Sequence, residues 1–294
     1  MNKKYRSLSG TLFDVSNYIL LSIIGIVAVL PFIYVVAGSF ASDSELTQRA
    51  VFLIPKTFTL SAYAFIFSTD TILKSIWVSL YVTILGTMVN LFFTVTMAYA
   101  LSKRGLMGRN TVLNMIVFSM LFGGGLIPTY IVIRELHMLD TYWALMIPGA
   151  ISAFNLIIVK NFFQELPQEL EEAAKIDGCT ELGLLWRIVL PLSMPVLATF
   201  TLFYAVGHWN NFFSALLYLN DPAKWPLQVM LRQIVLLSQM AAGDMSSVDP
   251  QFVKQQEQSI KMAVIVVGTI PILLVYPFLQ KHFAKGVLIG SVKG

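Results

Sequence analysis

Long blocks of apolar residues are the feature that most limits what this chain can fold into. They recur along its 294 residues, of which 56% are hydrophobic and only 12% are charged. Soluble domains carry about 25% charged residues, and an apolar helix of roughly 20 residues crosses the hydrocarbon core of a bilayer. The sequence therefore predicts an all-α integral membrane protein, with apolar side chains that face lipid as well as protein.

Six of these blocks are long enough to form transmembrane helices. They are expected at residues 17–40, 75–101, 110–133, 141–163, 192–219 and 260–280. An even number of spans places both termini on the same side of the membrane. The predicted organisation is an N-terminal segment 1–16, a six-span domain 17–284 and a C-terminal tail 285–294.

Lysine and arginine residues near the ends of the spans indicate the orientation. The segments predicted to share one side contain Lys3, Lys4, Arg6, Lys103, Arg104, Arg109, Lys281, Lys285 and Lys293. Because cationic loops resist translocation, this side is predicted to be cytoplasmic. Both termini and the loop 164–191 then lie inside, whereas 41–74, 134–140 and 220–259 lie outside.

The sequence lacks the residues that several classes of function need. The predicted span cores contain no Asp or Glu for an ion relay, and the chain has no G-x-x-x-x-G-K-[ST] phosphate loop or H-E-x-x-H pattern. The single cysteine excludes an intrachain disulfide, and the three histidines have no metal-ligand spacing. We expect no catalytic residue, cofactor site or metal site in this chain, so uphill transport would need an energy source in a partner. The net charge of +4 is explained by basic residues in cytoplasmic loops, so it does not indicate nucleic-acid binding.

The loop 164–191 is unusually polar for this chain and predicts two short helices joined by a break. Pro167 suits a first helical turn, and the glutamates after it lie near the positive end of the helix dipole. Gly178 is the expected left-handed stop, and Thr180 can cap a second, amphipathic helix. One interpretation is a compact cytoplasmic projection that binds a partner. The alternative is a helix lying on the membrane, although such helices are usually basic on their polar face.

The same loop resembles the signature loop of the membrane permeases of binding-protein-dependent ABC importers. The pattern E-A-A-x-x-x-G-x9-I-x-L-P is matched by Glu172, Ala173, Ala174, Gly178, Ile188, Leu190 and Pro191, with Asp177 as the family's usual aspartate before the glycine. Segments such as "GGGLIPTYIVI", "FNLIIVKNFF", "WNNFFSALLYL", "WPLQVMLRQI" and "GVLIGSVKG" are similar to the carbohydrate branch of MalG-like type. Within that branch the chain is most similar to permeases for complex saccharides, with uronate-containing saccharides such as alginate as one candidate.

The resemblance implies a transport subunit without enzymatic activity, with a coupling helix-turn-helix between spans four and five. Its implied partners are a second permease subunit, two ATPase subunits that bind ATP and Mg, an extracytoplasmic solute-binding protein and the oligosaccharide substrate. It also implies a bacterial cytoplasmic (inner) membrane, alternating access, and a contact between the C-terminus and the ATPases. The candidate residues for that contact are Ser291, Val292, Lys293 and Gly294. The alternatives are a permease for a non-sugar solute such as a peptide and an ion-coupled secondary carrier.

Polar residues of the predicted fifth span form a second candidate site. Thr201, Tyr204, His208 and Asn211 recur along one helical face, where they could line a sugar pathway or pair with neighbouring helices. The single amides of the second and fourth spans, Asn90 and Asn155, are interpreted as structural.

Two further segments carry predictions of irregular or interfacial structure. Residues 123–128, with three glycines and a proline, predict a break in span three that could serve gating or only packing. Residues 227–237 predict an amphipathic helix on the outer side, which could bind a solute-binding protein or rest on the membrane.

Overall fold

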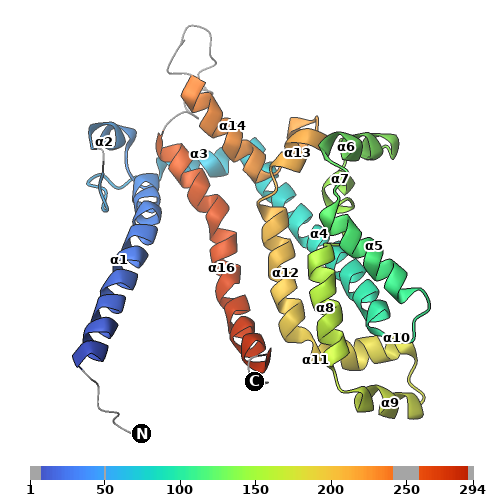
Figure 1. The fold of residues 1–294 in the computed structure, drawn as a ribbon. Helices are drawn as coiled ribbons and strands as arrows, with labels where there is room; N and C mark the ends of the chain where they lie inside the picture. The colour runs from blue at the N-terminus through green and yellow to red at the C-terminus, as the bar shows by residue number, and fades with distance from the viewer. Residues whose placement is uncertain (1–7, 50, 241–257, 291–294) are drawn as a thin grey trace. The chain divides into compact units, whose positions relative to one another are not determined.

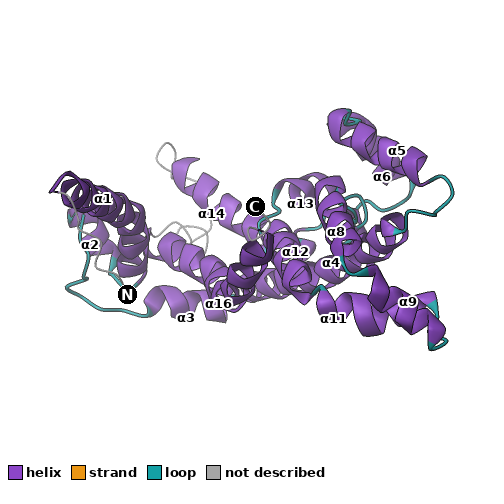
Figure 2. Ribbon diagram, turned by 60° about the horizontal axis from the view of Figure 1, so that its bottom comes forward, coloured by secondary structure: helices purple, strands orange, loops and turns teal. Residues whose placement is uncertain are grey.

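The computed structural model describes residues 8–49, 51–240 and 258–290. Within these ranges the regular secondary structure is helical, and the only β interaction is an isolated bridge between Ala41 and Phe58 (Figure 2). The chain divides into two compact units, Met1–Thr69 with Gln233–Thr269, and Asp70–Arg232 with Ile270–Gly294. The predicted all-α fold is confirmed for the described residues.

The first unit contains the N-terminal helices and the start of the last helix. Its elements are α1 (Leu8–Ser39), α2 (Asp43–Gln48), α3 (Ser61–Ser68), the end of α14 (Leu227–Met240) and the first part of α16 (Gln258–Gly290). The Asp43 carboxylate accepts hydrogen bonds from the backbone N–H (3.0 Å) and the hydroxyl (3.1 Å) of Ser259, close to the start of α16. An acidic group here satisfies a free N–H at a helix N-terminus and interacts favourably with the helix dipole.

A buried carboxylate organises the loop that follows α2. The Glu45 carboxylate accepts the backbone N–H of Lys56 at 3.0 Å and that of Thr57 at 3.2 Å, and it pairs with Arg49 at 2.6 Å. These hydrogen bonds, with the Lys56 N–H as the largest contribution, lower the pKa of Glu45 from 4.5 to about 2. The loop is therefore held by a carboxylate that stays ionised.

The second unit contains the remaining helices. They are α4 (Asp70–Ser102), α5 (Arg109–Leu121), α6 (Leu126–Glu135), α7 (Trp143–Met146), α8 (Ala153–Glu165), α9 (Gln168–Ile176), α10 (Glu181–Leu184), a π-helical turn η1 (Leu185–Val189), α11 (Leu190–Leu192), α12 (Met194–Trp209), α13 (Phe213–Tyr218) and a 3-10 turn η2 (Pro222–Lys224). Figure 1 shows α5, α8 and α12 alongside α4, with α9 and α10 at one end of this group and α6 and α13 at the other.

Small side chains on α4 allow α8 and α12 to pack closely against it. The buried positions of α4 include Ser75, Ser79, Gly86, Thr87, Asn90, Thr94 and Ala98. Small residues let helix backbones approach, which favours association in a membrane where no hydrophobic force drives helices together. A Cβ added at Gly86 would lie only 2.6–2.9 Å from the imidazole ring of His208 on α12, so this close approach requires glycine. α4 is therefore the central helix of this unit.

Three of the described helices are long and apolar enough to cross a membrane, namely Gly10–Ser39, Asp70–Ser102 and Gln258–Pro277. Two bent helix pairs raise the number to five if each pair counts as one span. The first pair, α5 and α6, is bent by 119° at the glycine run, which confirms the predicted break in span three. The second pair, Glu181–Leu192 with Met194–Trp209, is bent by 84°.

The predicted fourth and fifth spans are less regular than the apolar blocks suggested. Residues 141–163 contain the four-residue α7 and the separate α8, and 192–219 contains α12 and α13 with a break at 210–212. Continuous helices over these two ranges were therefore the wrong expectation, because mean apolarity does not detect the breaks between helices. Six spans remains a prediction for the chain as a whole.

Candidate functional site

The loop between α8 and α12 begins with the acidic helix α9, and Gly178 terminates this helix. Gly178 has φ +78°, and its N–H donates to the Lys175 carbonyl at 3.0 Å, while the N–H of Cys179 donates to the Ala174 carbonyl at 2.9 Å. These are the two hydrogen bonds of a Schellman motif. The predicted left-handed glycine stop is therefore confirmed in its geometry.

A second helical segment starts directly after this turn. Thr180 has an extended conformation, and its hydroxyl accepts the N–H of Gly183 at 3.2 Å, as predicted for an N-cap. α10 continues through η1 and α11 before the chain bends at Ser193 into α12. The loop thus consists of two capped helical segments that meet at a turn of fixed geometry.

The loop buries one set of apolar residues and exposes another. Its buried residues are Ala174, Leu184, Leu185 and Val189, which join the core formed with α4, α8 and α12. Ile176 (86% exposed), Leu182 (70%) and Trp186 (63%) instead face outward. These three side chains are available for contact with a partner or with lipid.

The residues of the E-A-A-x-x-x-G pattern do not all lie on that surface. Glu172, Ala173, Asp177 and Gly178 are exposed. Ala174 is only 8% exposed, so it serves the internal packing of the loop. In the I-x-L-P part of the same pattern, Ile188 and Leu190 are partly buried against the core formed with α4, α8 and α12, and Pro191 is exposed.

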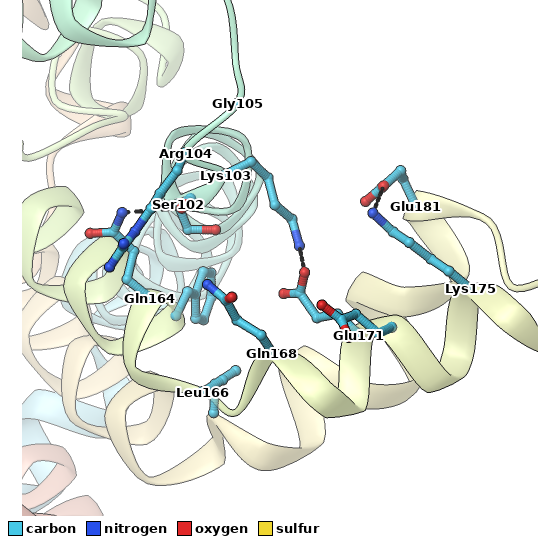
Figure 3. A pocket seen from close by; sticks show the side chains of 12 residues that line it. Ser102, Lys103, Arg104, Gly105, Gln164, Leu166, Gln168, Glu171, Lys175 and Glu181 are labelled. Atoms are coloured by element: carbon cyan, nitrogen blue, oxygen red, sulfur yellow. Dashed lines mark hydrogen bonds and ion pairs between the residues drawn. The ribbon is translucent and has the colours of Figure 1, made fainter.

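Charged residues tie both helices of the loop to the end of α4. Lys103 pairs with Glu171 of α9, and the Tyr99 hydroxyl donates to the Glu181 carboxylate of α10 at 2.7 Å. Lys175 of α9 pairs with the other oxygen of Glu181, also at 2.7 Å, and this hydrogen bond raises the pKa of Lys175. Figure 3 shows Lys103 pointing toward Glu171, and Lys175 toward Glu181.

These side chains surround a polar cleft of about 380 Å³ between α4, α8 and α9. It is lined by Ser102, Lys103, Arg104, Gly105, Phe163, Gln164, Leu166, Gln168, Glu171, Glu172, Lys175 and Glu181. The amide of Gln164 closes one wall by donating to the Ser102 carbonyl at 3.1 Å. Sequence reasoning treated Lys103 only as a topology signal and missed Tyr99 and Glu181, because partners about 70–80 residues apart leave no local pattern.

The four polar candidates of the predicted fifth span lie on or just after α12, and their polar groups make hydrogen bonds. The Tyr204 hydroxyl lies 2.8 Å from that of Thr94 on α4, and His208 Nε2 lies 2.5 Å from the side-chain oxygen of Asn90. Thr201 bonds to the carbonyl of Leu197, four residues earlier on the same helix. The Asn211 side chain accepts the Ser214 N–H at 3.2 Å, at the break after α12.

These bonds give Asn90, Thr94, Tyr204 and His208 a structural explanation. Asn90 also donates to the Gly149 carbonyl at 2.5 Å, so one amide joins α4, α12 and the turn before α8. Thr201 alone among the four lines a largely apolar cavity of about 440 Å³, bounded by α4, α12 and residues 271–275. Whether any of the four contacts a substrate remains a prediction.

An ion pair between Asp140 and Lys224 joins two further segments of the second unit. Lys224 Nζ lies 2.6 Å from the Asp140 carboxylate, and the other carboxylate oxygen accepts the N–H groups of Asn220 and Asp221 at 3.1 Å. The hydrogen bond from Lys224 is the largest cause of the lowered pKa of Asp140. This network fixes the turn before α7 against the end of α13.

Some predicted sites fall outside the described residues or receive no geometric support there. The C-terminal residues Ser291, Val292, Lys293 and Gly294 lie outside the described ranges, as do residues 241–257 of the segment 220–259 that was predicted to lie outside. The predicted amphipathic helix is present as α14 (Leu227–Met240). Among the described residues no group of three or more His, Cys, Asp or Glu side chains is arranged to hold a metal ion.

The apolar helices are those of a multi-pass membrane protein. A family model described as "Binding-protein-dependent transport system inner membrane component" matches residues 1–289. The chain therefore belongs to the family of binding-protein-dependent transport system inner membrane components, and it is a multi-pass inner-membrane protein.

Two curated relatives and one solved structure are similar over nearly the whole chain. Protein LplC of Bacillus subtilis (strain 168) is 62% identical over 286 residues, which cover 97% of this chain and 96% of that protein. The polygalacturonan/rhamnogalacturonan transport system permease protein YtcP of the same organism is 57% identical over 287 residues, covering 98% and 100%. A chain from the crystal structure of a bacterial ABC transporter involved in the import of the acidic polysaccharide alginate has a TM-score of 0.88 and 34% identity, covering 96% of this chain and 100% of its own.

Proposed function

We propose that this chain is a permease subunit of an ABC importer that carries an oligosaccharide into the cytoplasm by alternating access. The observation that carries the proposal is the two-helix loop 168–192, which presents exposed apolar and acidic side chains in a family of transport components. The chain itself is a transport subunit and not the enzyme that hydrolyses ATP. Separate ATPase subunits bind ATP and Mg and supply the energy, and a second permease subunit completes the pathway.

In this proposal the ATPase docks on the exposed side of the loop. Ile176, Leu182 and Trp186 supply apolar contacts, and buried aromatic anchors commonly contribute much of the affinity at such interfaces. The exposed Glu172 forms an ion pair with a basic group of the ATPase, because charge-assisted hydrogen bonds between carboxylates and Arg or Lys are strong and directional. Gly178 sets the angle between the two helices.

The proposed substrate is an oligosaccharide from an acidic polysaccharide. Two similar proteins support this class, since one is named for polygalacturonan and rhamnogalacturonan and the other for alginate. An extracytoplasmic solute-binding protein delivers the substrate to the outer face, in keeping with the family description. The alternatives are a non-sugar solute, such as a peptide, and an ion-coupled carrier.

The proposed topology places both termini and the loop in the cytoplasm. It rests on the basic residues that follow α4 and flank the predicted first and last spans. The organisation into 1–16, 17–284 and 285–294 belongs to the same proposal, as does the contact of Ser291, Val292, Lys293 and Gly294 with the ATPases.

Reconstitution into proteoliposomes tests this function. The chain, its partner permease, the ATPases and the binding protein are assembled with oligogalacturonate, and uptake is measured with ATP or with an ion gradient alone. We expect uptake only with ATP and with binding protein on the outer side. Uptake under an ion gradient without ATP would instead support the secondary carrier, and transport of peptides but not saccharides would overturn the substrate assignment.

A further inference from the structure

We propose that Tyr99 and Lys103, at the end of α4, are positioning residues that carry movement of the loop into the transmembrane helices. We call this set of contacts the α4 clamp and define it as Tyr99 and Lys103 with their partners Glu171, Lys175 and Glu181. The inference rests on the proposed function, because it assumes that an ATPase moves the loop. It names α4 as the helix that receives the movement.

The covalent connections of the loop are poorly suited to transmit a displacement. On one side, Leu166 and Pro167 between α8 and α9 are extended, with ψ of 140° and 126°. On the other side, the chain bends by 84° between Leu192 and Met194. A continuous helix is a rigid element, whereas an extended link or a sharp bend is where a hinge absorbs motion. The loop therefore needs a noncovalent connection to move a span as a unit.

The apolar core holds the loop against α4, α8 and α12 without directional bonds, and the α4 clamp adds directional bonds to α4 on both sides of the Gly178 turn. Lys103 pairs with Glu171 in α9, and Tyr99 donates to Glu181 in α10. The ammonium group of Lys103 also lies 4.4 Å from the centre of the Tyr99 ring, within cation–π range. Tyr99 on α4 and Lys103 directly after its last residue thus hold both helices of the loop.

Within the loop, a further ion pair makes the two helices move together. Lys175 of α9 and Tyr99 of α4 bind different oxygens of the same Glu181 carboxylate. Tyr99 is 9% exposed, whereas the side chains of Lys175 and Glu181 are 50% and 57% exposed. The bond from Tyr99 is therefore the shielded part of the network, and the Lys175–Glu181 pair contributes less because water screens it. The loop and the end of α4 therefore form one connected polar network.

α4 can pass the displacement to the opposite end of its unit. It is a single helix of 33 residues, and it packs along α8 and α12. At its other end, the Ser79 hydroxyl accepts the backbone N–H of Leu227 at 2.8 Å, at the start of α14, and α4 also packs against η2. A shift of the loop thus reaches the outer segments through one uninterrupted helix.

The experiment compares variants that remove the clamp but keep its bulk. Tyr99→Phe and Lys103→Met each remove a polar contact while preserving the ring or the aliphatic stem. The matched control is Glu135→Gln, which breaks the exposed Arg134–Glu135 pair on α6, far along the chain from the loop. Each variant is assembled with the partner permease, the ATPases and the binding protein, and ATPase retention, ATP hydrolysis and uptake are measured separately.

We expect the double variant Tyr99→Phe/Lys103→Met to retain the ATPase subunits but to import about five- to tenfold less substrate per ATP hydrolysed. Lys103→Glu should uncouple in the same way, and adding Glu171→Lys should restore part of the coupling. Rescue by exchanged charges distinguishes a positioning role from general loss of packing. Glu135→Gln should behave as wild type.

Different experimental results would overturn this inference and the proposed function. Wild-type coupling in the double variant, or no rescue by the exchanged charges, overturns the α4 clamp while leaving the importer assignment intact. Loss of ATPase retention in the double variant would also overturn it, because the clamp would then serve docking and not transmission. A wild-type chain that retains no ATPase overturns the proposed function itself.

Discussion

Substitution of Gly178 tests the geometry of the loop in a way that needs no knowledge of the substrate. Gly178 has φ +78°, and a Cβ added there would meet no atom within 4 Å. The cost of a side chain is therefore conformational, not steric. For alanine in the left-handed region it is about 1–2 kcal/mol, and asparagine costs less because its short polar side chain tolerates this conformation.

This energy translates into a graded loss of docking. If the ATPase binds only the bent loop, a cost of about 1–2 kcal/mol lowers its affinity by up to roughly five- to thirtyfold. The expected order of affinity is Gly, then Asn, then Ala, then Val, since a β-branched residue at positive φ is strongly disfavoured. Gly25→Ala serves as the control, because that glycine in α1 also has open space but no positive φ.

The assay measures binding of the purified ATPase to the detergent-solubilised permease across this series. The amount of folded permease is quantified in parallel, so that poor insertion is not counted as weak docking. Equal affinity for Gly178→Val and the wild type would refute the reasoning, because it would mean that the bend is not needed for docking. An order that follows side-chain volume, with Asn worse than Ala, would contradict the conformational explanation.

Two further predictions concern buried polar groups. The Glu45 carboxylate, with its pKa lowered to about 2 by the Lys56 N–H and other donors, contributes stability that is fully present above pH 4.5 and is lost as the pH falls through 2. The protection factor of the Lys56 amide, which is the intrinsic exchange rate divided by the measured rate at the same pH, should therefore decrease as the pH falls from 4.5 to 2 in the wild type but not in Glu45→Gln. An identical pH profile of protection in the two proteins would contradict this. Asn90→Leu removes the bonds to His208 and to the Gly149 carbonyl and should destabilise the protein by about 1–2 kcal/mol, read as a lower thermal midpoint in detergent. An unchanged midpoint would show that these bonds contribute no net stability.

Local signals in the sequence predicted the loop well. Helix-favouring residues after Pro167, a glycine needing positive φ and a threonine able to cap are each properties of a few adjacent residues, and the structure contains all of these features. The break at the glycine run of span three was predicted for the same reason. Such features are set by backbone conformation, which short sequence patterns specify.

Features that depend on distant contacts were not predictable in this way. The burial of Ala174 depends on α4 and α8 packing behind the loop, and the bond between Tyr99 and Glu181 joins residues 82 positions apart. Apolarity alone also overestimated the regularity of 141–163, because the break between α7 and α8 is stabilised by tertiary bonds such as that from Asn90 to Gly149. A single sequence carries no local record of these contacts.

Thiol labelling of Cys179 tests the central claim most directly, that an ATPase docks on the loop at the cytoplasmic face. Cys179 is the only cysteine of the chain, it directly follows Gly178, and it is partly exposed. We predict that a maleimide reacts with it from the cytoplasmic side and that the rate falls when the ATPase subunits are assembled. Equal labelling with and without the ATPase, or labelling only from the outer side, would contradict the account.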